Sequence, residues 1–382
     1  MSNLHKISED EKEARSKLWT GPCTAMVKMV SCKDFYVPER YLEIKEEIES
    51  LEIRSDDLFL ISYPKAGSTW CQEMVWQLKE GTNFEGGKRN LGERIPFLEL
   101  ESLYLRESDF PQKSVEDVKN KSSPRIIKSH LLTPFLPKDL LKVAKVIYIM
   151  RNPKDVCVSY YNHEKILISH EYTGSFEEYA ELFIQGKLLY GSYWDHLKFG
   201  LEIQKLDNVL LLCYENMKKD LIKEMKKVLD FMKWEDLSEE KLQILTEHLS
   251  FTKFQKNSAV NLDSDIGNKV NKNGHFIRKG IVGDWKNYFS SELSDRFDGK
   301  TKKLFRVRRD KCGGYFLQSG CIQSHCVRSS EDDGVEQHLG KVSSREKEEN
   351  YLSRIDQEFF GGSSILVNES LSNNPWPWIR RE

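Results

Sequence analysis

The sequence predicts an α/β protein with a single P-loop-like domain, in which helices flank a central parallel sheet. Three observations support this prediction. The chain has 382 residues, of which 39% are hydrophobic, enough to fill the core of one large domain or two small ones. Four apolar runs end in polar or charged residues, and helical segments separate them. Apolar strands that alternate with helices are typical of a parallel sheet covered on both faces.

The elements follow from the pattern of apolar residues along the chain. The expected strands are short apolar runs at residues 57–62, 124–130, 144–150 and 208–214. The expected helices have apolar residues at helical spacing and comprise residues 41–51, 71–78, 154–165, 176–199, 218–232 and 238–248. Residues 80–90 are rich in Gly and charge, which predicts a surface loop, and residues 95–123 predict short helices and loops.

Composition along the chain predicts three parts. Residues 1–40 are expected to form a peripheral N-terminal arm, and residues 41–299 the domain itself. Residues 300–382 show weak periodicity and charged runs, so we expect an atypical, poorly ordered C-terminal extension. Alternative splicing or a faulty gene model would both explain such an extension.

The bulk properties exclude several classes of function. A net charge of -2 provides no global attraction to nucleic acid or to an anionic membrane. The first 15 residues lack the apolar region of a secretory signal, and no apolar run of about 18 residues predicts a membrane span. The eight Cys are scattered, which favours free thiols and a cytoplasmic location. No His/Cys cluster has convincing metal-ligand spacing, so we expect no metal.

The stretch from Tyr63 to Trp70 is the most informative part of the chain. It joins the first strand to a helix and holds Lys65, Gly67 and two hydroxyl residues. Gly lets the backbone approach a ligand, and a helix N-terminus offers free N–H groups to an anion. The order differs from a Walker A loop because the Lys precedes the Gly. The stretch therefore predicts a phosphate site other than that of a Mg²⁺-bound triphosphate.

Charged residues also follow the other strands, where parallel sheets bind ligands. Lys128 and His130 share one face of the second strand, and a neutral His is a suitable general base. Arg151 ends the third strand, and Ser159 lies in the helix after it. A separate basic segment, Arg278-Lys279-Gly280, offers two cations beside an accessible backbone. Taken singly, Lys128 or His130 is better explained as a solvated residue, Arg151 equally well as the partner of a carboxylate, and the basic segment as a surface loop.

Four motifs in order resemble the cytosolic sulfotransferase family, over roughly residues 40–298. They are PKAGSTW at 64–70, KSHL at 128–131, RNPKDV with SYY at 151–161, and FIRKGIVGDWKN at 276–287. The resemblance implies that 3′-phosphoadenosine 5′-phosphosulfate, without a metal, is the co-substrate. It implies transfer of a sulfuryl group to a hydroxyl or amine of a small, phenolic or alcoholic acceptor.

The resemblance also implies roles for individual residues. The donor's phosphosulfate end would be held by Lys65, Ala66, Gly67, Ser68 and Thr69. Its adenine would lie near Trp70, Tyr214, Phe251 and Phe276, and its 3′-phosphate near Arg151, Ser159, Arg278, Lys279 and Gly280. His130 would act as the general base with Lys65 and Lys128 as catalytic cations. Such a transfer depends on positioning and charge stabilisation, as phosphoryl transfer does.

Two further expectations concern the acceptor and the assembly. Phe97 and Tyr161 are candidates for an aromatic acceptor pocket, although ordinary core packing explains each of them equally well. The family's dimer signature is degraded: its ends are Lys286 and Asp295, and Ser290-Ser291 replaces its Thr-Val centre. This replacement weakens the case for a homodimer through the segment.

Two other functions remain open at this stage. A P-loop nucleotide kinase would need a Walker A loop and an Asp that holds a metal ion, and the sequence offers neither. A non-catalytic module that only binds the donor is the second alternative. The presence of Lys65, Lys128 and His130 argues against it.

Overall fold

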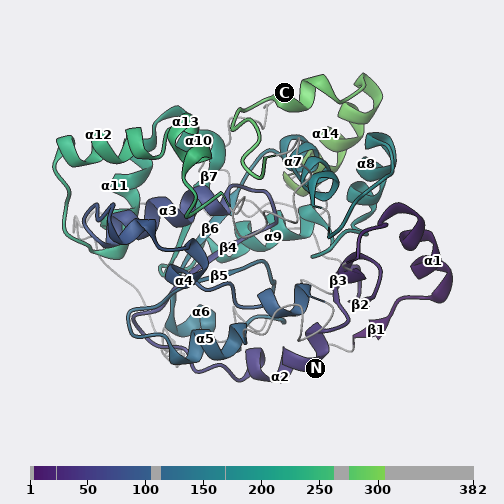
Figure 1. Cartoon of the computed structure of the whole chain (residues 1–382), viewed down its shortest axis with the longest axis horizontal. Helices are drawn as coiled ribbons and strands as arrows, with labels where there is room; N and C mark the ends of the chain where they lie inside the picture. The colour runs from purple at the N-terminus through teal and green to yellow at the C-terminus, as the bar shows by residue number, and fades with distance from the viewer. Residues whose placement is uncertain (1–3, 23, 105–112, 168, 262–274, 306–382) are drawn as a thin grey trace, which may run out of the picture.

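The computed structural model describes residues 4–22, 24–104, 113–167, 169–261 and 275–305. Its central sheet has four parallel strands in the order β5-β4-β6-β7 (Figure 1). They are β4 (Leu58–Ser62), β5 (Ile126–Ser129), β6 (Lys145–Met150) and β7 (Val209–Cys213). All four predicted strands are confirmed, each within two residues of its expected ends.

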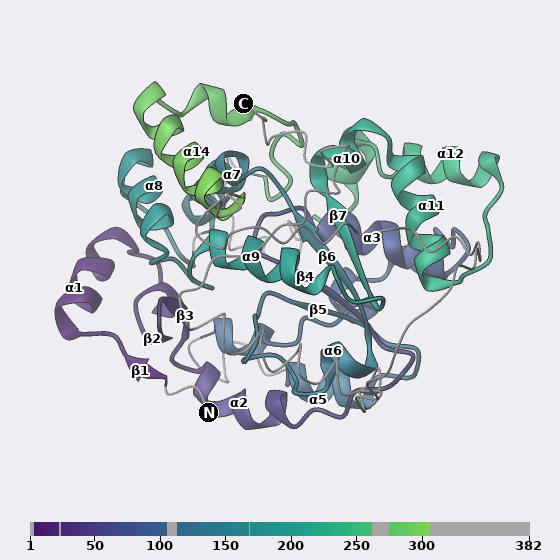
Figure 2. The ribbon, with the colours of Figure 1, turned by 180° about the vertical axis from the view of Figure 1, so that it is seen from behind.

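Side chains of the central strands alternate between two apolar cores. Leu58 and Leu60 of β4 pack with helices α3 (Ser68–Lys79), α11 (Leu221–Met232) and α12 (Glu239–His248). Phe59 and Ile61 face the other way, toward α7 (Pro153–Ile166) and α9 (Tyr193–Ile203). Figures 1 and 2 show the two groups of helices on opposite sides of the sheet. Burial on both faces explains why these strands are apolar runs rather than alternating patterns.

Further helices between residues 41 and 256 complete this part of the fold. They are α2 (Tyr41–Glu49), α4 (Leu91–Arg94), α5 (Ser114–Asn120), α6 (Leu140–Val143), α8 (Phe176–Gln185), α10 (Tyr214–Lys219) and α13 (Phe251–Lys256). The single helical stretch predicted over 176–199 is wrong, because α8 and α9 are separate helices. Gly186 ends α8 in the left-handed conformation at φ 71°, and a Cβ there would lie 3.0 Å from Ser192.

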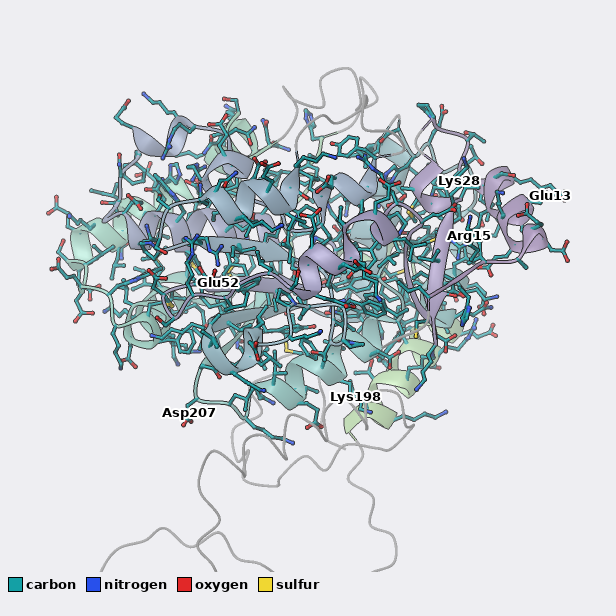
Figure 3. The ribbon with its side chains drawn as sticks, turned by 90° about the horizontal axis from the view of Figure 1, so that it is seen from below. Glu13, Arg15, Lys28, Glu52, Lys198 and Asp207 are labelled. Carbon is teal, nitrogen blue, oxygen red and sulfur yellow. The ribbon has the colours of Figure 1, made fainter. Side chains whose placement is uncertain are left out.

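The N-terminal segment contributes to the core, so the prediction of a peripheral arm is wrong. It forms an antiparallel sheet of β1 (His5–Lys6), β2 (Met29–Cys32) and β3 (Phe35–Pro38), together with α1 (Glu9–Leu18). Val30 and Val37 have no exposed surface and belong to the same core as Phe59. In Figure 3, Glu13 lies on the outer side of this segment and Arg15 on its inner side. Arg15 donates hydrogen bonds to the carbonyl oxygens of Lys187, at 2.5 Å, and Met26, at 3.4 Å.

The last described helix, α14 (Ser291–Phe305), crosses the predicted domain boundary at residue 299. Its Phe297 is fully buried and stacks on Phe183, with ring centroids 5.6 Å apart. The core therefore uses side chains close to that boundary. The rest of the predicted extension, residues 306–382, lies outside the described residues. Among the described helices, none combines the length and apolar character that crossing a membrane requires.

Candidate active site

The loop after β4 turns the chain sharply into helix α3. Gly67 sits at φ 108°, and a Cβ on it would lie 2.6 Å from Cδ2 of the Tyr214 ring. Lys65 also has a positive φ, of 65°. Since only Gly adopts such a conformation at little cost, and no side chain has room at position 67, Gly67 is required by the fold of the loop. The loop thus brings backbone N–H groups of the α3 N-terminus to the edge of a cavity.

This cavity, of about 680 Å³, lies at the carboxyl ends of the parallel strands. The predicted site residues that line it are Lys65, Gly67, Ser68, Thr69, Trp70, Phe97, Lys128, His130, Arg151, Ser159, Tyr214, Phe251, Phe276, Arg278, Lys279 and Gly280.

Two predicted site residues do not line the cavity. Ala66 belongs to the loop but is fully buried. Tyr161 packs against Phe176 and Tyr179 in the core, with ring centroids 5.3 and 5.6 Å away. Its neighbour Tyr160 lines the cavity instead.

His130 lies in the cavity wall with a defined tautomer. Its Nδ1 is 2.5 Å from the carbonyl oxygen of Ser62, which only accepts hydrogen bonds. Nδ1 therefore carries a proton, and Nε2 carries the lone pair that can receive one. Burial, and secondly the charge of Lys128, hold the pKa of His130 well below its usual range. The imidazole is therefore neutral near pH 7, as a general base must be.

Two buried side chains that the sequence analysis missed hold the backbone of His130. The Glu99 carboxylate accepts the His130 backbone N–H at 2.6 Å and the Ser129 hydroxyl at 2.9 Å. Nε2 of His196, from α9, donates to the His130 carbonyl at 3.0 Å. Glu99 is 1% exposed, and burial raises its pKa. Only its place two residues after Phe97 hinted at Glu99, and nothing in the sequence hinted at His196.

Two lysines share the cavity with His130. Burial is the main cause that lowers the pKa of Lys65 to about 7, and the nearby cations Lys128 and Arg151 lower it further. Burial also lowers the pKa of Lys128, whose ammonium lies 3.8 Å from the Phe97 ring centroid. Nζ of Lys65 lies 3.3 Å from Nδ1 of His163. His163 is another residue that the sequence analysis missed. The cations thus repel one another, and an anion in the cavity would relieve that repulsion.

Arg151 joins the loop after β4 to Ile281, the residue that follows the basic segment 278–280. Its Nη1 and Nη2 donate to the carbonyl oxygens of Lys65, at 3.4 Å, and Ile281, at 3.1 Å. Its guanidinium lies 4.2 Å from the Tyr214 ring centroid. Its Nε is buried and has no hydrogen-bond partner among the described residues. A buried donor of this kind calls for an acceptor oxygen from a ligand.

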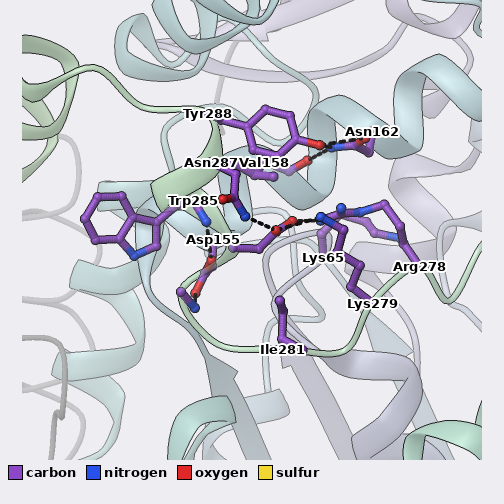
Figure 4. A network of polar contacts seen from close by, with 12 residues as sticks. Lys65, Asp155, Val158, Asn162, Arg278, Lys279, Ile281, Trp285, Asn287 and Tyr288 are labelled. Carbon is purple, nitrogen blue, oxygen red and sulfur yellow. Dashed lines mark hydrogen bonds and ion pairs between the residues drawn. The ribbon is translucent and has the colours of Figure 1, made fainter.

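Carboxylates order the basic segment and the residues that follow it, as far as Trp285 (Figure 4). Asp155 of α7 accepts the backbone N–H groups of Gly283 at 2.7 Å and Trp285 at 3.1 Å. Asp284 pairs with Arg278 and, at 2.8 Å, with Nζ of Lys279. Burial alone would raise the pKa of Asp284, but its hydrogen bonds, first with Lys279 and then with Arg278, outweigh burial and lower that pKa to about 2. The two cations are therefore held at the cavity edge.

The arrangement combines an anion site with a neutral base. Among the residues that the structure describes, no group of three or more His, Cys, Asp or Glu side chains could hold a metal ion. The groups in the described cavity that can neutralise an anionic ligand are thus its Lys and Arg side chains. Such a site suits in-line transfer of an anionic group to an acceptor that His130 deprotonates.

Comparison with known proteins agrees with the motifs. The family model described as the sulfotransferase domain matches residues 55–307 of this chain. The luciferin sulfotransferase of Photinus pyralis is 36% identical over 281 residues, which are 69% of this chain and 75% of that protein. Sulfotransferase 1E1 of Mus musculus is 37% identical over 271 residues, covering 70% of this chain and 90% of that protein.

Solved structures share the fold. Retinol dehydratase in complex with androsterone and the inactive cofactor PAP superposes with a TM-score of 0.73 at 26% identity. That match covers 81% of this chain and 98% of the dehydratase. Mouse sulfotransferase SULT7A1 complexed with PAP gives a TM-score of 0.60 at 27% identity, over 73% of this chain and 95% of that one.

Proposed function

We propose roles for the cavity residues from the premise that this chain belongs to the sulfotransferase family. As a member it transfers a sulfuryl group from 3′-phosphoadenosine 5′-phosphosulfate to a small acceptor. One observation carries the assignment of roles: His130, with a basic Nε2, shares one cavity with the cations Lys65 and Lys128.

The donor's two phosphorylated ends correspond to two groups of cations. Lys65 and the α3 N-terminus would hold the phosphosulfate end, aided by the hydroxyls of Ser68 and Thr69. Arg151, Arg278 and Lys279 would hold the 3′-phosphate, with Ser159 and Gly280 beside them. The partnerless Nε of Arg151 supports this fit.

Aromatic side chains supply the surface for the adenine. Trp70 and Tyr214 meet edge to face, with ring centroids 5.5 Å apart, and Trp70 is anchored by a hydrogen bond to the Leu249 carbonyl. Phe251 and Phe276 line the same cavity. Flat apolar faces beside a polar rim suit a purine ring.

Catalysis would rest on one base and two cations. The donor supplies an activated sulfuryl group on a phosphate leaving group. Nε2 of His130 takes the proton of the acceptor hydroxyl as its oxygen bonds to sulfur. The bond between that sulfur and the phosphate oxygen breaks, and the leaving phosphate keeps the electron pair. Lys65 neutralises the phosphate, and Lys128 stabilises the sulfuryl oxygens.

The acceptor would lie next to His130 against apolar and aromatic walls. The Phe97 and Tyr190 rings contact the imidazole edge to face, at centroid distances of 5.1 and 5.3 Å. Leu100, Leu103 and Leu189 extend the apolar surface of the cavity. We therefore infer a phenol or another small apolar alcohol as the acceptor class.

The homodimer remains a prediction about residues 286–295. Ser290 uses its hydroxyl to accept the backbone N–H of Leu293, so it starts α14 and offers little apolar surface. We infer that this segment does not hold two copies together. Sedimentation equilibrium of the full chain tests this, and a tight dimer that Ser290→Val leaves unchanged would point to another interface.

A transfer assay tests the proposal. The full chain is incubated with ³⁵S-labelled donor and a panel of phenols, aliphatic alcohols, sterols and amines. We expect a labelled phenol or alcohol, and a loss of about 10²–10⁴-fold in kcat with His130→Ala. Adenosine 3′,5′-bisphosphate should still bind that variant. Donor binding without transfer by the unaltered chain would favour a non-catalytic binding module, and transfer that does not depend on His130 would contradict its role.

A further inference from the structure

A second histidine lies at the catalytic lysine. Nδ1 of His163 is 3.3 Å from Nζ of Lys65, although the residues are 98 positions apart. His163 belongs to α7, one turn after Ser159, and both line the cavity. On the other side, Nζ of Lys65 lies 4.2 Å from the centroid of the Phe276 ring. The Lys65 ammonium thus lies between an imidazole nitrogen and an aromatic face.

The chemistry of the pair fixes the direction of the hydrogen bond. Nζ of Lys65 has only protons to offer when charged, so Nδ1 of His163 must accept. Burial, and secondly the charge of Lys65, hold the pKa of His163 well below its usual range, so its ring is neutral. Among the described residues, no carboxylate forms an ion pair with Lys65, so His163 provides the hydrogen-bond acceptor seen for this ammonium.

We propose that His163 is a positioning residue that holds the Lys65 side chain ready for the donor's 5′-phosphate. This inference rests on the proposed role of Lys65. The backbone of Lys65 is fixed by the loop, but its long side chain would otherwise sample many rotamers. Binding a phosphate would then carry the entropic cost of ordering the Lys65 side chain, and the preformed contact with His163 removes part of that cost.

Two substitutions distinguish the contribution of the His163 Nδ1 acceptor from that of its aromatic ring. His163→Phe keeps an aromatic ring in the cavity wall but has no acceptor, whereas His163→Asn restores an acceptor oxygen near the position of Nδ1. We expect His163→Phe to weaken binding of adenosine 3′,5′-bisphosphate about tenfold by titration calorimetry. The KM for the donor should rise to a similar extent, and His163→Asn should recover most of both losses.

A double-mutant cycle assigns the loss to Lys65. In a Lys65→Met background, His163→Phe should change bisphosphate affinity less than twofold, because the lysine that it positions is gone. Thermal unfolding of each variant checks that the chain still folds. If His163→Phe destabilises the fold, the Asn variant and the Lys65→Met background still report the coupling.

Three results would overturn the inference. They are unchanged affinity in His163→Phe, an equal loss in the Phe and Asn variants, and an equal loss with and without Lys65. Its failure is distinguishable from failure of the proposed function, which would appear as absence of transfer by the unaltered chain. Bisphosphate binding tests the Lys65–His163 contact in either case.

Discussion

Binding of the bisphosphate product should take up protons, because Lys65 is largely uncharged in the free protein above neutral pH. Burial, together with the charges of Lys128 and Arg151, lowers its pKa to about 7. A phosphate beside Nζ favours the charged form and raises that pKa again. Affinity for adenosine 3′,5′-bisphosphate should therefore fall as pH rises from about 7 toward the pKa of the bound state.

The magnitude follows from the protonation of Lys65 in the free protein. A pKa of about 7 leaves Lys65 with about 0.1 proton at about pH 8, so full charging on binding takes up about 0.9 proton. Lys128 adds a smaller uptake of the same sign, because burial lowers its pKa. The ligand contributes little, because its phosphates titrate at about pH 6 and are ionised at about pH 8.

Titration calorimetry in buffers of different ionisation enthalpy measures this uptake directly. Lys65→Met should remove most of it at about pH 8 and leave the share of Lys128. Lys226→Met, on the exposed face of α11, is the matched control and should change nothing. The reasoning is refuted if binding takes up no protons at about pH 8, or if Lys65→Met takes up as many as the unaltered chain.

Two other substitutions test the loop and the core. Gly67→Ala should weaken bisphosphate binding at least about tenfold by calorimetry, since position 67 has φ 108° and no space for a Cβ. Gly81→Ala, at φ 62° with open space, is its control, and equal effects on binding would contradict the argument. Arg125→Met leaves Asp57 unpaired in the core, where the two side chains are 1% and 0% exposed. Arg125→Met should lower the free energy of unfolding, measured in urea, by about 3–5 kcal/mol. The control Arg296→Met, at an exposed ion pair, should lower it by less than about 1 kcal/mol. A loss below about 1 kcal/mol in Arg125→Met would show that the buried pair contributes little to stability.

Much of the fold could be predicted because its strongest signals are local. Each strand of the central sheet is an apolar run buried on both faces, and a polar or charged residue lies at its end or directly after it. The N-terminal segment was misjudged because β2 and β3 are only four residues long. Their burial comes from packing against distant parts of the chain, which local composition does not reveal.

The rotation of helix α7 shows the same limit at the site. Tyr160 and Tyr161 are adjacent and chemically identical, yet only Tyr160 lines the cavity. Successive helical residues differ by about 100° in direction, so the face that packs on the sheet decides which tyrosine reaches the ligand. The sequence led us to Tyr161, whereas packing places Tyr160 at the cavity.

The sequence by itself determined the parallel sheet, the loop after its first strand and the residue types that meet an anionic donor. These depend on apolar runs, helix starts and strand ends, which are properties of neighbouring residues. Only the tertiary structure decided which nitrogen of His130 is basic, which carboxylate holds its backbone and which imidazole meets Lys65. Those contacts join residues 31 to 98 positions apart, and the pKa values that follow depend on burial by the whole fold.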